Sequence, residues 1–305
     1  MAFVECVPNI SEGRRLDIVE AMATSVREAR GVHLLDQTSD PDHNRSVLTL
    51  AGAPTSLTAA VLALFDAAIA AIDLRTHRGV HPRVGAVDVV PFVPVGNVTM
   101  TTCVELARDT AAEVARRFEI PVYLYEEAAV SHERRNLADI RRGQFEGLTE
   151  KLQSPGWAPD FGPRRPHPTA GATIIGARRP LVAFNVNLDT DQLDVAVAIA
   201  RAVRHRDGGL PFVKAMGVPL VGRGLVQVSM NLTNVDVTPP HLAFEAVQAE
   251  ARRRGVRVHG SELIGLMPAS AVAAAAAAHL QLSAFGPAQV LETRVLDAEL
   301  REHTR

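Results

Sequence analysis

Apolar positions along the chain follow two spacings, and each predicts one kind of secondary structure. Short apolar runs bounded by turn residues predict strands, whereas apolar residues three or four positions apart predict helices that bury one face. In the first half we expect strands at Phe3–Val7, Val32–Asp36, Arg45–Ala51, Val84–Val95 and Pro121–Tyr125, and helices at Arg14–Arg30, Pro54–Asp73 and Thr101–Phe118. This order is βαββαβ, followed by one further helix and strand.

The second half repeats the pattern of the first. Its strands are expected at Leu181–Val186, Val213–Met216, Leu225–Met230 and Val256–His259, and its helices at Asp191–Arg204 and Pro240–Arg254. The segments ISEGRRLDIVEAM and LDTDQLDVAVAIA also match locally, with Leu16-Asp17 aligned on Leu193-Asp194. We therefore predict an α+β protein of two βαββαβ units, residues 1–178 and 179–305, each an antiparallel sheet with helices on one face.

The segment between the halves, residues 126–170, has a different composition. His132–Lys151 has the charged character of short helical pieces, and SPGWAPDFGPRRPHPTAG follows with several prolines among glycines. Composition alone favours a stiff linker over a binding loop, and both interpretations stay open.

Composition and charge narrow the classes of function. A net charge of −2 and an aromatic content of 4% argue against nucleic-acid binding through basic patches or ring stacking. The longest apolar stretch, Ala59–Ile72, is interrupted by Asp66 and is shorter than the roughly 20 residues of a membrane span. With no secretory signal at the N-terminus, we expect a cytoplasmic protein that binds no membrane. Cys6 and Cys103 are expected to be buried apolar residues.

The segment Arg75–Gly85 concentrates His and Arg directly before an expected strand. The spacing of His77 and His81 would suit two zinc ligands on a helix, but Gly79 and Pro82 interrupt that helix and no further ligand stands at the required spacing. An imidazole beside a proline and two arginines fits proton transfer at an anionic substrate, because its reference pKa of about 6.5 lets it accept and donate. A solvated surface loop explains the same composition.

Two other polar clusters adjoin expected strands. Asp40–Arg45 places carboxylates, an imidazole, an amide and a guanidinium between two strands, although an Asx-turn explains part of this pattern. Gln227, Ser229 and Asn231 alternate onto one face of a strand, which is either a binding surface or a solvent-exposed face. The glycine-rich phosphate-binding motifs and the serine nucleophile elbow are absent from the sequence.

Six segments taken in order resemble the glutamate formiminotransferases: ECVPNISEG, DPDHNRSV, HRGVHPRVGAVDVVPFVPV, PVYLYEEA, WAPDFGP and QVSMNLTN. The resemblance runs through nearly the whole chain, and HPRVGAVDVVPF is highly specific. It implies two ferredoxin-like subdomains, usually paired in a homodimer. It also implies transfer of the formimino group of N-formimino-L-glutamate to N5 of tetrahydrofolate, with release of glutamate, in histidine breakdown. Tetrahydrofolate is then a cosubstrate, and no metal or nucleotide is needed.

The resemblance also implies site residues. The acid/base histidine of the family's HPR triplet falls on His81, and the folate-contacting stretch after WAPDFGP replaces the linker interpretation. This stretch comprises Gly162, Pro163, Arg164, Arg165, Pro166, His167, Pro168, Thr169, Ala170 and Gly171. It reads differently in the animal enzymes, so contacts through backbone and charge are expected. Because both substrates carry carboxylates, polar and cationic residues complete the candidate set: Asp40, His43, Asn44, Arg45, Arg78, Arg83, Gln227 and Asn231.

Two alternatives accompany this hypothesis. One is a formyltransferase acting on N-formylglutamate or 5-formyltetrahydrofolate. The other is a non-catalytic folate-binding protein; the presence of His81 with Arg78 and Arg83 argues against this second alternative. The animal enzymes carry a cyclodeaminase domain after this one. This chain ends at Arg305, so we expect it to lack that activity and to depend on a separate cyclodeaminase.

Overall fold

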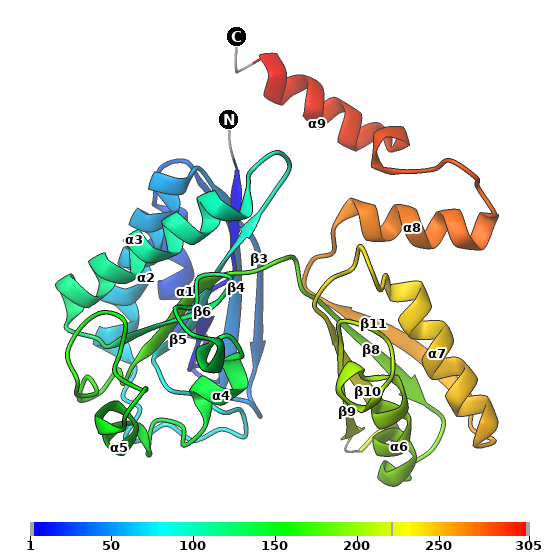
Figure 1. The fold of residues 1–305 in the computed structure, drawn as a ribbon, viewed down its shortest axis with the longest axis horizontal. Coiled ribbons are helices and arrows are strands. Elements are labelled where there is room, and N and C mark those ends of the chain that lie inside the picture. The colour runs from blue at the N-terminus through cyan, green and yellow to red at the C-terminus, as the bar shows by residue number, and fades with distance from the viewer. Residues whose placement is uncertain (1–2, 221, 303–305) are drawn as a thin grey trace. The chain divides into compact units, whose positions relative to one another are not determined.

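The computed structural model describes residues 3–220 and 222–302. The chain divides into two compact units, one ending at Arg178 and the other beginning at Arg179 (Figure 1). The elements of the N-terminal unit are β1 (Val4–Cys6), β2 (Asn9–Ile10), α1 (Leu16–Arg27), β3 (Val32–Asp40), β4 (Arg45–Gly52), α2 (Pro54–Ala71), β5 (Val87–Pro94), α3 (Met100–Phe118), β6 (Val122–Glu126), α4 (Leu137–Arg141), α5 (Leu148–Gln153) and β7 (Thr173–Ala177).

The N-terminal sheet contains the predicted βαββαβ arrangement. β1 and β2 are two parts of one interrupted strand, since both pair antiparallel with β4 on one side and β5 on the other, while β3 pairs with β4. The order β5, β1/β2, β4, β3 is that of a ferredoxin-like unit, which confirms the predicted fold class. Helices α1, α2 and α3 cover one face of the sheet (Figure 1), where their apolar residues form the main core.

Two features of this unit differ from the prediction. β7 inserts between β5 and β6 and pairs parallel with both, so the sheet is mixed rather than antiparallel throughout. The other face of these three strands is also covered, because Ile140 of α4 and Leu148 and Leu152 of α5 pack on Tyr123 and Ile174. The segment between the predicted halves is therefore a folded part of this unit.

Helix α2 shows how the sequence pattern sets local structure. It begins at Pro54, in the first turn, where the missing N–H of proline is tolerated. Its apolar stripe of Leu57, Val61, Leu64 and Ala68 is buried in the core. By length and composition α2 is the one helix of the described residues that could cross a membrane, but here this stripe packs against α1, α3 and the sheet.

The C-terminal unit repeats the same arrangement. Its elements are β8 (Val182–Leu188), α6 (Leu193–Val203), β9 (Val213–Leu220), β10 (Leu225–Leu232), α7 (Pro240–Arg253), β11 (Val258–Ile264), α8 (Ala269–Leu280) and α9 (Leu291–Glu302). All pairings are antiparallel in the order β11, β8, β10, β9. The aligned residues Leu16 and Leu193 begin α1 and α6, so the local sequence match marks equivalent helices.

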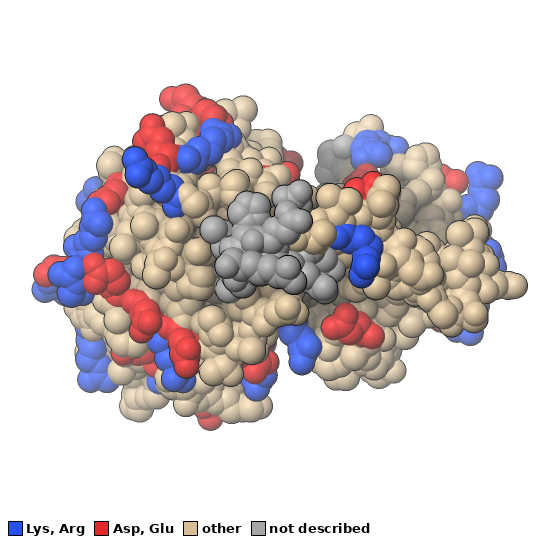
Figure 2. Space-filling model, turned by 90° about the horizontal axis from the view of Figure 1, so that it is seen from above, with Lys and Arg blue, Asp and Glu red and all other residues tan. Residues whose placement is uncertain are grey.

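Charges of both signs interleave on the surface of the N-terminal unit. On the face seen in Figure 2 (left), Lys and Arg alternate with Asp and Glu and form no patch of one sign. This agrees with a net charge of −2.

Candidate active site

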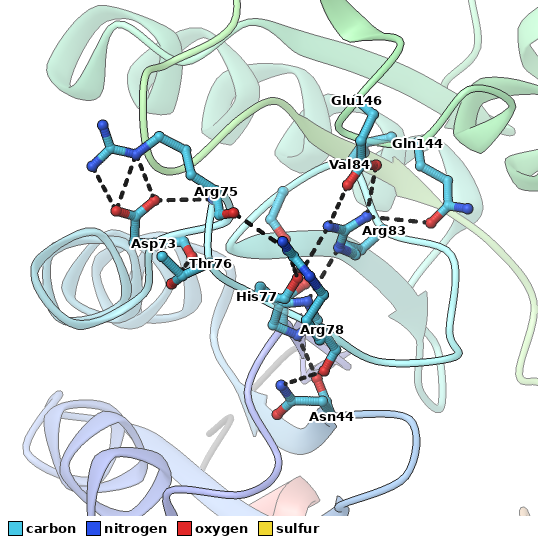
Figure 3. A network of polar contacts seen from close by, with 12 residues as sticks. Asn44, Asp73, Arg75, Thr76, His77, Arg78, Arg83, Val84, Gln144 and Glu146 are labelled. Atoms are coloured by element: carbon cyan, nitrogen blue, oxygen red, sulfur yellow. Dashed lines mark hydrogen bonds and ion pairs between the residues drawn. The ribbon is translucent and has the colours of Figure 1, made fainter.

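The segment Arg75–Gly85 joins α2 to β5, and His77 fixes it in place. His77 is buried, and its Nδ1 accepts a hydrogen bond from Arg83 Nε at 3.1 Å (Figure 3). The other ring nitrogen, Nε2, therefore carries the proton and donates to the backbone oxygen of Asn44 at 3.0 Å. Both nitrogens are engaged, so His77 ties two loops together and is not free to bind a metal. Among residues 3–220 and 222–302 there is no cluster of three His, Cys, Asp or Glu suited to a metal ion.

Arg83, predicted to bind substrate, is engaged in the same network. Its guanidinium forms two hydrogen bonds with the Glu146 carboxylate, at 2.8 and 2.9 Å, besides the bond to His77 (Figure 3). The Arg83 side chain is 8% exposed, whereas that of Glu146 is 62% exposed. Arg83 thus anchors the loop to the segment between α4 and α5. Arg78 is exposed and donates to the backbone oxygens of Arg75 and His77.

Asn44 joins three loops. Its Nδ2 donates to the backbone oxygen of Arg78 at 3.0 Å and its Oδ1 accepts from the backbone N–H of Gly13 at 2.9 Å. A φ of 49° places Asn44 in the left-handed region, which Asn tolerates better than most residues. Gly79 packs so closely that a Cβ there would lie 2.3 Å from the backbone oxygen of His43. This packing brings the turn at Asp40–Arg45 against the loop that carries His81.

His81 lies half-buried among cations. Its ring centroid is 5.8 Å from that of His43, and the two rings are nearly perpendicular. Burial, and then the guanidinium groups of Arg45 and Arg141, lower the pKa of His81 to about 3, while the Asp88 carboxylate opposes them. At neutral pH the imidazole is therefore uncharged.

Asp88 organises this region from within a strand. Its Oδ1 accepts the backbone N–H of Val84 at 2.6 Å and of Gly85 at 3.2 Å, and its Oδ2 accepts Arg141 Nε at 2.9 Å. The Asp88 side chain is 3% exposed and that of Arg141 is 12% exposed. This buried ion pair fixes the end of the His81 loop and holds Arg141 beside it. Neither residue is among those predicted from the sequence; a charged residue within the apolar run VGAVDVVPF was the available signal for Asp88.

Arg45 differs from Arg83 in its partners. Its Nε is buried and has no hydrogen-bond partner in the part of the chain that the structure describes. Burial, followed by repulsion from Arg141, lowers the pKa of Arg45 to about 10, so it remains charged at neutral pH. A buried, charged donor without a partner beside His81 is suited to hold an anionic group of a substrate.

The stretch Gly162–Gly171 packs against both ends of the loop that carries His81. The backbone N–H of Leu74 donates to the backbone oxygen of Thr169 at 2.9 Å, and the backbone N–H of Ala86 donates to that of Ala170 at 3.0 Å. His167 and Gly171 pair across a tight loop, and His167 Nδ1 accepts the backbone N–H of Ala170 at 3.0 Å.

The residues Gly162–Pro168 of this stretch differ in their exposure. Arg164 and Pro168 are exposed, Pro163 and Pro166 are half-buried, and Arg165 lies 3.5 Å from Glu119 in an ion pair exposed on both sides. At Gly162, where φ is +85°, a Cβ would meet the backbone oxygen of Ile120 at 2.6 Å.

Gln227 and Asn231 belong to the C-terminal unit, on the face of its sheet opposite α6 and α7. Gln227 is buried and donates to Asn187 Oδ1 at 2.9 Å and to Glu262 Oε2 at 3.2 Å, whereas Asn231 is exposed. Asn187 also donates to Glu262 at 2.8 Å. Of the polar residues that alternate along β10, Gln227 thus belongs to a hydrogen-bonded network, whereas Asn231 faces solvent.

A separate hollow of about 310 Å³ lies beside the same loops. It is lined by Glu12, Arg14, Arg15, Asn44, Ala71, Ile72, Asp73, Thr76, His77 and Arg78, and His81 is not among these residues. We place the candidate chemistry at His81, because Arg45, whose Nε has no hydrogen-bond partner among the described residues, lies beside this histidine.

Comparison with known proteins identifies the family. The Formiminotransferase domain, N-terminal subdomain, matches residues 3–178, and the Formiminotransferase domain matches residues 183–286. The glutamate formimidoyltransferase of Streptococcus pyogenes serotype M1 is 48% identical over 96% of this chain and 98% of its own. That of Thermoplasma acidophilum is 46% identical over 97% and 98%. The formimidoyltransferase-cyclodeaminase of Sus scrofa is 42% identical over 90% of this chain but 52% of its own length. The chain therefore belongs to the formiminotransferase family.

Proposed function

We propose that this protein transfers the formimino group of N-formimino-L-glutamate to N5 of tetrahydrofolate and releases glutamate, as a step of histidine degradation. The observation that carries the proposal is a neutral, half-buried His81 flanked by Arg45 and Arg141. Full-length similarity to glutamate formimidoyltransferases supports the choice of substrates. In this proposal the N-terminal unit provides the acid/base histidine.

The reaction requires two proton transfers. N5 of tetrahydrofolate attacks the amidine carbon, and the attacking nitrogen must lose a proton before the glutamate nitrogen departs with one. A neutral imidazole accepts the first proton, a step of general base catalysis that contributes about 10²–10⁴-fold. Alignment of the two substrates supplies a further part of the rate.

The cations explain substrate binding. Both substrates are carboxylates, and we propose that the free Nε of Arg45 receives one of them. Binding an anion there offsets the repulsion that Arg45 exerts on His81, so the pKa of His81 rises once substrate is bound. The imidazole is then a stronger base toward the proton of N5.

Folate is proposed to contact Gly162–Gly171 through backbone groups and through Arg164. Gln227 and Asn231 are kept as proposed binding residues within the C-terminal unit. Arg78 and Asn44 complete the proposed binding residues, whereas Arg83 acts through His77 and Glu146. A cytoplasmic homodimer that hands its product to a separate cyclodeaminase completes the proposal.

The test supplies tetrahydrofolate together with formiminoglutamate or formylglutamate and follows the folate product by chromatography. Formation of 5-formiminotetrahydrofolate from the first donor alone supports the proposal, and product from formylglutamate alone identifies a formyltransferase. Folate binding without reaction of either donor identifies a binding protein. His81→Asn is expected to lower kcat by at least about 10²-fold with little change in folate affinity. Unchanged turnover of this variant refutes the acid/base role.

A further inference from the structure

A carboxylate fixes the second imidazole near the site. His43 Nδ1 lies 2.8 Å from Asp40 Oδ2. The other oxygen, Oδ1, accepts the backbone N–H of Asp42 at 2.9 Å and of His43 at 2.8 Å. Asp40 therefore holds both the backbone and the ring of His43.

This contact determines which atom of His43 exchanges protons. Because a carboxylate only accepts hydrogen bonds, Nδ1 carries the proton and Nε2 is the nitrogen that gains or loses one. A carboxylate that orients an imidazole in this way is a recurring arrangement in acid/base catalysis.

The two imidazoles have different surroundings. His81 is half-buried near Arg45 and Arg141, which disfavour a further positive charge. His43 faces the Asp40 carboxylate within its own turn, and its side chain is 49% exposed. Its ring lies edge to face with His81 at 5.8 Å, and Arg45, Arg141 and Asp88 lie around His81. A proton on His43 is thus compensated by the hydrogen-bonded Asp40 carboxylate, whereas near His81 the Asp88 carboxylate only partly offsets burial and the two arginines.

We propose that the Asp40–His43 pair donates the proton to the departing glutamate nitrogen, while His81 accepts the proton from the attacking N5. This inference rests on the proposed formimino transfer and divides its two proton transfers between two histidines. The N5–carbon bond forms as N5 loses its proton to His81. The bond from carbon to the glutamate nitrogen breaks as that nitrogen takes the proton from His43 Nε2. Solvent exchange then returns His81 to its neutral form and His43 to its protonated form.

The experiment compares wild type, His43→Ala, Asp40→Asn and the control Asp42→Asn for formimino transfer over a range of pH. We expect kcat of His43→Ala to fall about 10²-fold, with KM within threefold of wild type. Wild-type kcat should decline as pH rises, and this decline should be absent in His43→Ala. Asp40→Asn should lose about tenfold in kcat. Asp42→Asn removes a carboxylate from the same turn and should stay within twofold.

Chemical rescue separates proton donation from a structural role. Because His43 is exposed, added imidazole should restore turnover of His43→Ala in proportion to the imidazolium concentration, and it should not restore Asp40→Asn. Circular dichroism checks that each variant is folded. If His43→Ala keeps kcat within threefold, keeps the wild-type pH profile, or is not rescued by imidazole, the proposal is overturned. If wild type forms no 5-formiminotetrahydrofolate, the proposed function itself fails, which is a distinct result.

Discussion

Replacing Asp88 with Asn removes the negative charge from the ion pair that holds Arg141 beside His81. The amide oxygen still accepts the backbone N–H groups of Val84 and Gly85, but the amide nitrogen faces a guanidinium that also only donates. Arg141 is left 12% exposed with an uncompensated charge. We therefore expect a loss of stability that exceeds the loss of one ordinary hydrogen bond.

The size of the loss follows from the burial of the pair. Removing one partner of a buried ion pair costs about 3–5 kcal/mol, because the other charge remains buried. For a domain of this size each kcal/mol lowers Tm by about 2–4 °C, so Asp88→Asn should lower Tm by about 6–20 °C. An exposed pair gives the comparison. Glu113→Gln breaks the contact with Arg116, whose side chain is 71% exposed, and should lower Tm far less than Asp88→Asn does.

The assay is thermal and urea unfolding followed by circular dichroism, with a double-mutant cycle. Asp88→Asn, Arg141→Met and the double variant are measured together. The loss of unfolding free energy in the double variant should be smaller than the sum of the two single losses by at least about 2 kcal/mol. Turnover of Asp88→Asn should also fall, since the loop before β5 loses its anchor. A Tm within 2 °C of wild type, or strictly additive losses, would show that the pair does not hold this region together.

Three further outcomes follow from the site. Arg45→Met should raise Tm slightly, because it removes a buried donor without a partner, and should raise KM for formiminoglutamate at least about tenfold; a lower Tm contradicts this. Gly79→Ala should lower kcat at least about tenfold, because its Cβ meets the backbone oxygen of His43, whereas Gly286→Ala, whose Cβ meets nothing within 4 Å, should behave as wild type. Burial alone raises the pKa of Glu12, but hydrogen bonds from backbone N–H groups outweigh it and lower that pKa. The stabilisation that the Glu12 carboxylate gives the fold is therefore present above the unfolded pKa of about 4.3 and is lost as pH falls through the lower folded pKa. Urea unfolding should therefore find Glu12→Gln less stable at pH 7 by about 1–3 kcal/mol, with a difference that shrinks below about pH 4.3.

The fold was largely predictable because its elements carry strong local patterns. Helix α2 begins at Pro54, and α1 and α6 begin at the aligned residues Leu16 and Leu193. β7 was not predicted, because five apolar and small residues beside a segment rich in proline and glycine resemble a linker. Its identity as a central strand depends on pairing with β5 and β6, which the local sequence does not express.

The site was predictable only where its residues are close in sequence. His81, His43 and Arg45 stand in compact polar clusters, and the structure brings those clusters together. Arg141 gave no local signal, since it lies on a short charged helix and its partner Asp88 is 53 residues away. For the same reason the sequence did not distinguish Arg83 from Arg45, because the carboxylate that engages Arg83 is 63 residues distant.

The contrast between these two arginines explains the choice of anchor for a substrate carboxylate. Arg83 already has a carboxylate and an imidazole as partners, so an arriving substrate would have to displace them. Arg45 has a buried Nε without a partner in the described residues, a condition that costs folding free energy. In the proposed complex a substrate carboxylate satisfies that donor and offsets the repulsion from Arg45, which after burial is the next cause of the lowered pKa of His81. Under the proposed function the same contact would bind the substrate and make His81 a stronger base, which would link affinity to catalysis through one residue.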